Sequence, residues 1–251
     1  GRVLSHPPIP ARQGAPGTGP LHPVFRQGQI APGTSSLFHG IVNNQNFSLN
    51  AAGRTVFGAD LDAGGPGAAG GLWSDARFGV LQLVALSDGP APGTGGEAFN
   101  NNAFFVLGTA LSDGNTVLLH ARLKPSSNVG GSNDTGLWST RTPGTGLPGN
   151  LRLLVRESSP VPPGSGPDYE GLNFDEIGPF WVNAAGRAAF ITLHNDFTRA
   201  LWIEQADGSL APIVKEFTLF DVHGDGMDQR LIAAIDAAPG PAGTGEGRRV
   251  A

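Results

Sequence analysis

The sequence predicts an all-β protein made of tandem units, each resembling one four-stranded antiparallel blade of a β-propeller. Three observations lead to this class. First, the 251 residues include 39 Gly and 21 Pro, and short apolar clusters lie between them, which is typical of many short strands joined by turns. Second, three sequence landmarks recur along the chain in a fixed order. Third, these landmarks repeat about every 60 residues, which suits a large blade.

The first landmark is an Asn-Ala-Ala-Gly turn followed by an apolar stretch. It occurs at residues 50–57 and again at residues 183–190, and a weaker copy begins at Leu111 with Gly114 as its turn glycine. Partial copies stand at Gly1 and Gly247. Since Asn and Gly tolerate a positive φ, each copy predicts a tight turn between two antiparallel strands.

The second landmark is a tryptophan after Gly-Leu or Ala-Leu, at Trp73, Trp138 and Trp202. The third is an apolar strand that runs into a Pro-Gly turn, at residues 24–34, 83–94 and 154–165, each followed by a phenylalanine: Phe38, Phe99 and Phe174. Because one tryptophan recurs at the same place in each unit, we expect the three to make equivalent core contacts.

Within one unit we expect strands at 47–49, 54–61, 71–74 and 80–86, with a turn at 50–53. The Ala-Pro-Gly-Thr segment then ends the pairing, because proline cannot donate to a strand ladder.

We therefore predict about four blades in a single domain, 1–251, with units at roughly 1–52, 53–113, 114–185 and 186–246. The alternatives are another kind of tandem β-repeat, such as a β-solenoid with shorter coils, or a part of a larger propeller. Both ends fall inside a repeat, so we interpret the chain as a fragment of a longer precursor. Its terminal strands either close a ring or leave open edges that pair with another subunit.

The composition excludes several classes of function. The net charge is −5 and Lys124 and Lys215 are the only lysines, so no basic stripe is present and a nucleic-acid partner is not expected. The chain has no cysteine, which excludes thiol catalysis and Cys-based metal sites. No run of 18 apolar residues occurs, so we expect no transmembrane segment.

The turn motif Asn50-x-x-Gly53-x-x-Val56-Phe57, with its closer copy Asn183-x-x-Gly186-x-x-Ala189-Phe190, resembles the repeat of the bacterial choice-of-anchor tandem repeat NxxGxxAF-containing proteins. The Gly-Leu-Trp and Ala-Pro-Gly-Thr elements are similar to the rest of that repeat, although residues 1–23 and 217–246 match poorly. The resemblance implies an exported, extracellular or cell-surface protein. It brings no catalytic residues to this chain.

Three groups of residues are candidates for chemistry. Asp221, Asp225 and Asp228 lie in an Asp/Gly-rich stretch that could hold Ca²⁺, but the stretch lacks the closing Glu of an EF-hand, and we prefer to interpret it as a solvated linker. The six histidines, spread over different units without metal-ligand spacing, are interpreted as individual surface or strand residues: His6, His22, His39, His120, His194 and His223. We therefore assign no metal site and no cofactor.

The third group is acidic and lies in the longest insertion. Asp168, Glu170, Asp175 and Glu176 stand near three aromatic residues, Tyr169, Phe180 and Trp181. A carboxylate pair with aromatic platforms is what a glycan-cleaving site needs, whereas an exposed loop before an apolar strand has the same composition. No serine nucleophile elbow and no phosphate-binding loop is present, so we assign no catalytic residue.

Two functions from different classes follow. The first, which we favour, is a non-catalytic extracellular or cell-surface module with a structural, adhesion or assembly role, whose partners are other protein subunits or surface glycans. The alternative is an extracellular glycan-binding or glycan-cleaving propeller enzyme, with acids converging from several blades.

Overall fold

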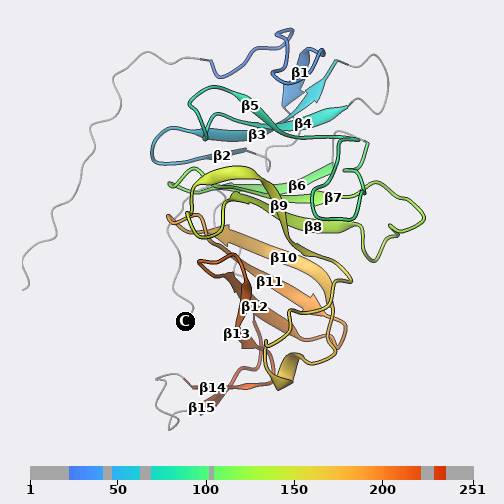
Figure 1. The fold of residues 1–251 in the computed structure, drawn as a ribbon, viewed down its shortest axis with the longest axis vertical. Helices are drawn as coiled ribbons and strands as arrows, with labels where there is room; N and C mark the ends of the chain where they lie inside the picture. Colours follow the sequence, from blue (N-terminus) through green and yellow to red (C-terminus); the bar gives the residue numbers. More distant parts are fainter. Residues whose placement is uncertain (1–22, 42–46, 63–68, 102–104, 222–228, 236–251) are drawn as a thin grey trace, which may run out of the picture.

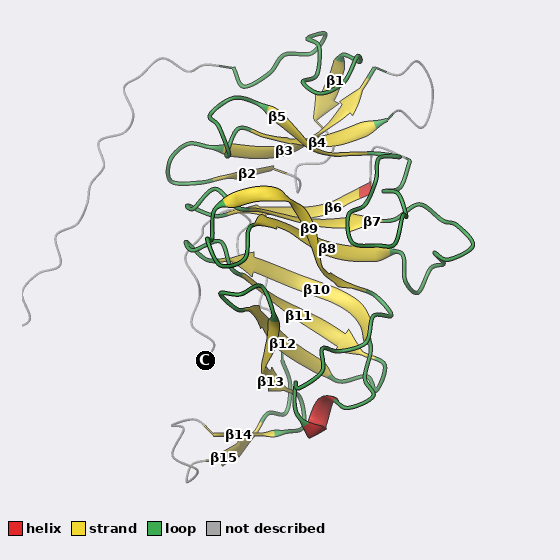
Figure 2. Cartoon of the chain, in the orientation of Figure 1, coloured by secondary structure: helices red, strands yellow, loops and turns green. Residues whose placement is uncertain are grey.

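The computed structural model describes residues 23–41, 47–62, 69–101, 105–221 and 229–235. These residues form an all-β array in which three antiparallel sheets stack one on another in chain order (Figure 1). Apart from short 3₁₀ turns, no helix is present in this part of the chain (Figure 2). The predicted array of blade-like, four-stranded antiparallel sheets is confirmed.

The second and third sheets are meanders whose strands pair in sequence order, and in the first sheet two short strands both pair with the strand that follows them. The first sheet contains β1 (Phe38–Ile41), β2 (Phe47–Leu49), β3 (Thr55–Leu61), β4 (Gly70–Ser74) and β5 (Gln82–Leu86). The second contains β6 (Val106–Leu111), β7 (Val117–Arg122), β8 (Thr135–Arg141) and β9 (Pro148–Arg156). The third contains β10 (Phe174–Val182), β11 (Ala188–His194), β12 (Arg199–Glu204) and β13 (Leu210–Lys215).

The strands expected in the first unit are confirmed to within two residues at their ends, and the structure adds β1. Both β1 and β2 pair with β3, so together they hold the position of a first strand. The turns at Gly53, Asn115 and Gly186 therefore join the first strand of a sheet to its second. Each sheet therefore begins before the predicted unit boundary, because the boundaries were placed at these turns and the first strand of each sheet lies before its turn.

In the weak copy of the turn motif, the turn residue lies one position later in the chain than expected. Asn50 Oδ1 accepts a hydrogen bond from Arg54 N, and in the second sheet Ser112 Oγ accepts the equivalent bond from Thr116 N. The turn residue with positive φ is accordingly Asn115, at 66°, and not Gly114. Gly114 instead allows two neighbouring turns to lie close together, because a Cβ at this position would lie 2.6 Å from the Ala184 carbonyl oxygen in the turn of the third sheet.

The core lies between the sheets. We call the side of a sheet that faces the N-terminus of the array its near face and the opposite side its far face. Three far-face positions recur: Val56, Leu72 and Ala85 in the first sheet are buried by the second sheet, and Leu118, Leu137 and Val155 are buried in the same way by the third. Near faces carry the tryptophans, and Trp73, Trp138 and Trp202 are fully buried, which confirms their predicted core role.

A leading loop precedes each sheet and is closed by a single bridge: Ile30 to Leu37, Pro90 to Ala98, and Pro160 to Asn173. The two-stranded ribbon of β14 (Leu219–Asp221) and β15 (Gln229–Leu231) follows the last strand of the third sheet, as the second and third leading loops follow the last strands of the first and second sheets. Its base is closed by Phe217 N donating to Ile232 O, as Ser158 N donates to Phe174 O one unit earlier. The ribbon is therefore the leading loop of a fourth unit.

Candidate functional site

The four acidic residues proposed for glycan chemistry do not meet in a cavity. Asp168 and Glu170 belong to the short 3₁₀ turn η2 (Pro167–Tyr169) and its end, while Asp175 and Glu176 lie on β10, and all four are exposed. Of the aromatic neighbours, Tyr169 is buried in the core and Trp181 is 45% exposed. The structure thus separates the residues that the sequence places together.

The histidines and the candidate Ca²⁺ loop give no converging site in the described chain. His39, His120 and His194 lie in three different sheets, and His6, His22 and His223 fall outside the described residues. Asp221 ends β14, whereas residues 222–228, with Asp225, also fall outside. Within the ranges that the structure describes, no three His, Asp or Glu side chains are grouped closely enough to hold a metal ion.

The leading loop of the third unit differs from the other two in its contact with the sheet. Trp73 Nε1 donates to Pro32 O at 3.0 Å and Trp138 Nε1 donates to Pro92 O at 2.9 Å, so each Pro-Gly turn is held down on its tryptophan. Trp202 Nε1 is buried and finds no acceptor among the described residues. The third loop carries Pro162 and Pro163 before Gly164, and the indole N–H donates to no carbonyl of this turn.

The third sheet also carries buried polar residues where the other sheets are apolar. Phe174 pairs with His194, as Phe38 pairs with Leu61 and Phe99 with Leu123. His194 is fully buried, its Nε2 lies 3.3 Å from Thr192 Oγ1, and its Nδ1 has no partner in the described chain. Burial lowers the pKa of His194 to about 4, so the ring is neutral at physiological pH.

Tyr169 closes this cluster from the third leading loop. Its ring meets Trp202 edge-on at a centroid distance of 5.2 Å and lies 6.0 Å from the His194 ring. Lys215 Nζ lies over the same tyrosine ring and donates to Asp168 O at 2.8 Å and to Asp196 Oδ2 at 2.9 Å. These contacts fix the inserted loop at its tip, because a cation, a carbonyl and a carboxylate meet there.

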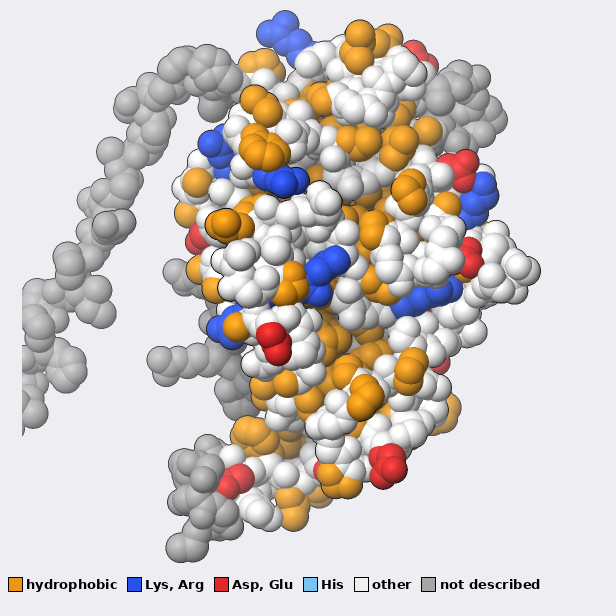
Figure 3. All heavy atoms as spheres, in the orientation of Figure 1, with side chains coloured by type: hydrophobic (Ala, Val, Ile, Leu, Met, Phe, Trp, Pro, Cys, Tyr) orange, Lys and Arg blue, Asp and Glu red, His pale blue; other side chains and the backbone are white. Residues whose placement is uncertain are grey.

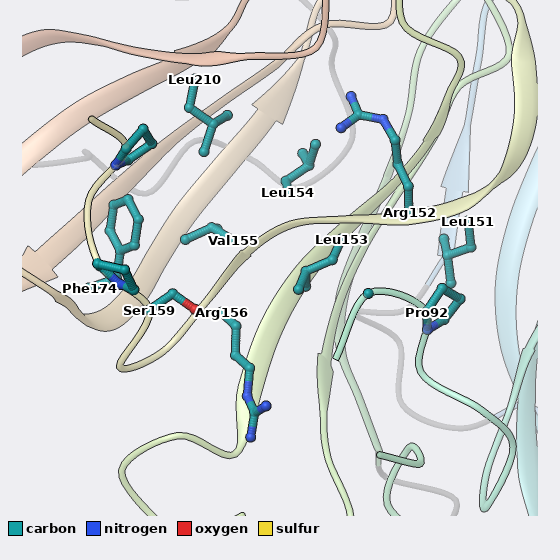
Figure 4. A pocket seen from close by; sticks show the side chains of 13 residues that line it. Pro92, Leu151, Arg152, Leu153, Leu154, Val155, Arg156, Ser159, Phe174 and Leu210 are labelled. Atoms are coloured by element: carbon teal, nitrogen blue, oxygen red, sulfur yellow. The ribbon is translucent and has the colours of Figure 1, made fainter. Parts of the chain in front are cut away.

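A cleft of about 380 Å³ opens between the second sheet and the third unit (Figure 4). One wall is the outer strand β9, which supplies every residue from Leu151 to Arg156, and the other comes from Pro160, Pro162, Phe174 and Leu210. Pro92 and Gly93 of the second leading loop border it at one end. Figure 3 shows hydrophobic side chains gathered on this face around β9 and β10.

The electrostatics of the cleft are set by two arginines. Arg152 and Arg156 are the only ionisable side chains among the described residues that line it, and they point to opposite sides of β9 in Figure 4. Arg152 is neutralised, because its Nη2 pairs with the buried Glu204. Arg156 Nε donates to Asn133 O at 3.0 Å, but its Nη2 is buried and has no acceptor in the described chain.

Sequence reasoning missed this cleft. Two features of the sequence mark the third unit as different from the others. One is the second proline in the Pro162-Pro163-Gly164 turn. The other is Pro212, which pairs with Trp202, whereas Leu83 and Leu153 pair with the first two tryptophans. Neither signal identifies β9 as the facing wall, because that contact joins two different units.

The fold and the cleft define a tandem β-repeat protein whose stacked blade-like sheets carry a cleft lined by two arginines and, among the described residues, by no acid. The chain belongs to a family of unknown function, DUF7453, whose sequence profile matches residues 14–251. No curated protein and no solved structure was found to match it. No helix in the described residues is long and apolar enough to cross a membrane.

Proposed function

We propose that this chain is a non-catalytic extracellular or cell-surface module with an adhesion, structural or assembly role. One observation carries the proposal: no Asp, Glu or His lines the cleft among the described residues. Hydrolysis of a glycosidic or ester bond by side chains alone needs a proton donor and a base or nucleophile within hydrogen-bond reach of the scissile bond. The guanidinium groups of Arg152 and Arg156 supply neither.

The repeated polar contacts support the same role. Asn50 Nδ2 donates to Ser112 O at 3.0 Å and to Asn115 Oδ1 at 2.8 Å, which ties the turn of the first sheet to that of the second. Arg141 and Glu204 tie the second sheet to the third. These contacts hold neighbouring sheets together, and the resemblance to choice-of-anchor repeat proteins supports export to the cell surface.

A panel of polysaccharides and model esters tests this proposal. We expect no release of reducing ends or alcohol above buffer from protein whose buried tryptophans show native fluorescence. Repeated turnover on any member of the panel, lost on heat denaturation of the same sample, would show that the chain is an enzyme.

A second candidate role, glycan binding, is favoured by Arg156, a partly exposed cationic side chain that lines one end of the cleft. A polysaccharide bearing carboxylates could pair one carboxylate with this guanidinium and lay its apolar ring faces on Leu154 and Leu210, which are partly exposed. Affinity electrophoresis in gels containing polygalacturonate tests this directly. We expect retardation of the native protein and of Arg77→Gln, a matched change at an exposed arginine, and loss of retardation in Arg156→Gln. Equal mobility of the three proteins with and without the polysaccharide would exclude this ligand.

A further inference from the structure

The third leading loop is anchored to its sheet differently from the first two. In those units the carbonyl of the turn proline accepts the indole N–H of the tryptophan. Pro162 stands at the same place after the closing bridge, but its carbonyl accepts the Ser165 hydroxyl at 2.7 Å, and Trp202 Nε1 finds no acceptor among the described residues. A Cβ on the turn glycine of either earlier loop would lie 2.8–2.9 Å from a leucine of its sheet, whereas a Cβ on Gly164 would meet no described atom within 4 Å. The Pro-Gly turn of the third loop thus lacks both contacts that fasten the other two.

The third loop is held instead by the turn inserted in it. Tyr169 in this turn is buried and packs on Trp202. His194 lies beneath the inserted turn, and its ring centroid is 6.0 Å from that of Tyr169, 5.8 Å from that of Phe174 and 6.0 Å from that of Trp202. In the first two sheets a leucine holds the position of His194. The least anchored leading loop therefore covers an ionisable side chain where the other two units have an apolar one.

The charged groups around His194 are paired with one another. Lys215 on β13 donates to the carbonyl oxygen of Asp168 in the loop and to the carboxylate of Asp196 in the turn after β11. Burial raises the pKa of Asp196, but hydrogen bonds to its carboxylate outweigh this effect and lower the pKa to about 2. Burial raises the pKa of Tyr169 to about 12, so the phenol stays neutral in acid. A protonated His194 therefore adds a second buried cation beside Lys215, which already holds the Asp196 carboxylate.

From these observations we propose that acid opens the third leading loop while the three sheets stay folded, and that this opening withdraws one wall of the cleft. Lifting the loop takes Tyr169 off His194, so water solvates an imidazolium that the closed loop confines among three rings. Pro160 and Pro162 belong to this loop and line the cleft opposite β9, so the cleft loses them as the loop lifts. The inference goes beyond the adhesion role proposed above and requires no ligand.

The two states of the loop bind a proton at His194 with different affinities. Burial lowers the pKa of His194 to about 4 in the closed loop, whereas the ordinary value of 6.5 applies when the ring is exposed. The open loop therefore takes up the proton more readily, and the ratio of open to closed loop rises as the pH falls from 6.5. The rise levels off below pH 4, at up to about 300-fold for a shift of this size.

Tyr169 is the only tyrosine of the chain, which allows a sharp test, because 3-fluorotyrosine incorporated during expression puts a single fluorine atom on the loop. At pH 7 we expect a ¹⁹F resonance whose shift is the same in H₂O and in D₂O, as for a buried ring. Between pH 6.5 and pH 4 a solvent-sensitive resonance should gain intensity, with saturation transfer detecting it while its population is small. Far-UV circular dichroism of the same samples should stay unchanged.

Two variants separate His194 from the rest of the chain. Thr192→Ala combined with His194→Leu replaces the polar pair with apolar residues and should abolish the growth of the solvent-sensitive resonance. His120→Leu is the control, because burial lowers the pKa of His120 to about 4 as well, but this ring lies on β7 and contacts Phe180 on β10. Its titration should match that of the native protein.

Three results would overturn the proposal: no solvent-sensitive resonance in the native protein down to pH 4, its persistence in the double variant, or its appearance only together with loss of the sheet signal. None of them changes the turnover expected in the substrate panel, so the opening of the loop and the non-catalytic role fail separately.

Discussion

Arg141 Nη1 lies 2.8 Å from Glu204 Oε1, in an ion pair that is buried between the second and third sheets. Glu204 is fully buried and also accepts hydrogen bonds from Arg152 and, at 3.2 Å, from Ala188 N. Burial lowers the pKa of Arg152, while the carboxylate beside it acts in the opposite direction. One carboxylate thus compensates two guanidinium groups at the junction of two sheets.

We expect Glu204→Ala to lower the free energy of unfolding by roughly 3–5 kcal/mol, because the buried Arg141 and the partly exposed Arg152 lose their counter-ion. Urea denaturation followed by tryptophan fluorescence measures this. The control is Lys124→Ala, which removes an exposed ion pair with Asp88 and should cost less than about 1 kcal/mol. Equal effects of the two substitutions would contradict a clamp at Glu204.

The turn asparagines should differ in their importance although their motifs match. The Asn50 side chain caps its own turn and also donates to the turn of the next sheet, whereas the Asn183 side chain, among the described residues, only accepts the bond from Arg187 N, at 3.0 Å. Asn50→Ala should therefore cost about 1–2 kcal/mol more than Asn183→Ala. Chemical denaturation of both variants checks the difference, and the reverse order would show that the inter-sheet bond contributes nothing.

The tryptophans provide a matched pair for the leading loops. Trp138→Phe loses a hydrogen bond to Pro92 O, but Trp202→Phe removes an indole N–H that has no acceptor in the described chain. Since both changes shrink a fully buried side chain by the same amount, their difference reports the polar contact. We expect Trp138→Phe to be the more destabilising by about 1–3 kcal/mol. Thermal melts of the two variants are the measurement.

His194 should make the fold sensitive to acid. Burial lowers the pKa of His194 from 6.5 to about 4, so below pH 6.5 the unfolded chain binds a proton that the folded chain refuses until about pH 4. Stability is fully present above pH 6.5 and is lost as the pH falls from 6.5 to 4, by about 3 kcal/mol for a shift of this size.

The expected acid sensitivity can be tested by replacing Thr192 and His194 with the apolar residues that hold their positions in the first two sheets. Thr192→Ala combined with His194→Leu reproduces Ala59 with Leu61 and Ala121 with Leu123. The double variant should reduce the loss of stability between pH 6.5 and pH 4. Part of it will remain, because burial also lowers the pKa of His120 to about 4. An unchanged pH profile would assign the acid sensitivity to other groups.

The sequence by itself determined the repeat, the strands and the tryptophan positions. These features depend on local chemistry: Asn and Gly permit the turn at residues 50–53, proline ends the pairing after β5, and alternating apolar residues define each pleat. Local chemistry was not enough for the turn at Ser112, where a serine takes the role of asparagine and Asn115 takes that of glycine. Only the hydrogen bonds reveal that equivalence.

The tertiary structure decided everything that lies between units. The pairing of Arg141 with Glu204 and the wall that β9 gives to the cleft both bring together residues of different units. The acids at 168–176, which looked like a site because they are close in sequence, are exposed and line no common cleft in the described chain. Proximity along the chain does not fix separation in space, because stacking of the sheets determines which side chains meet.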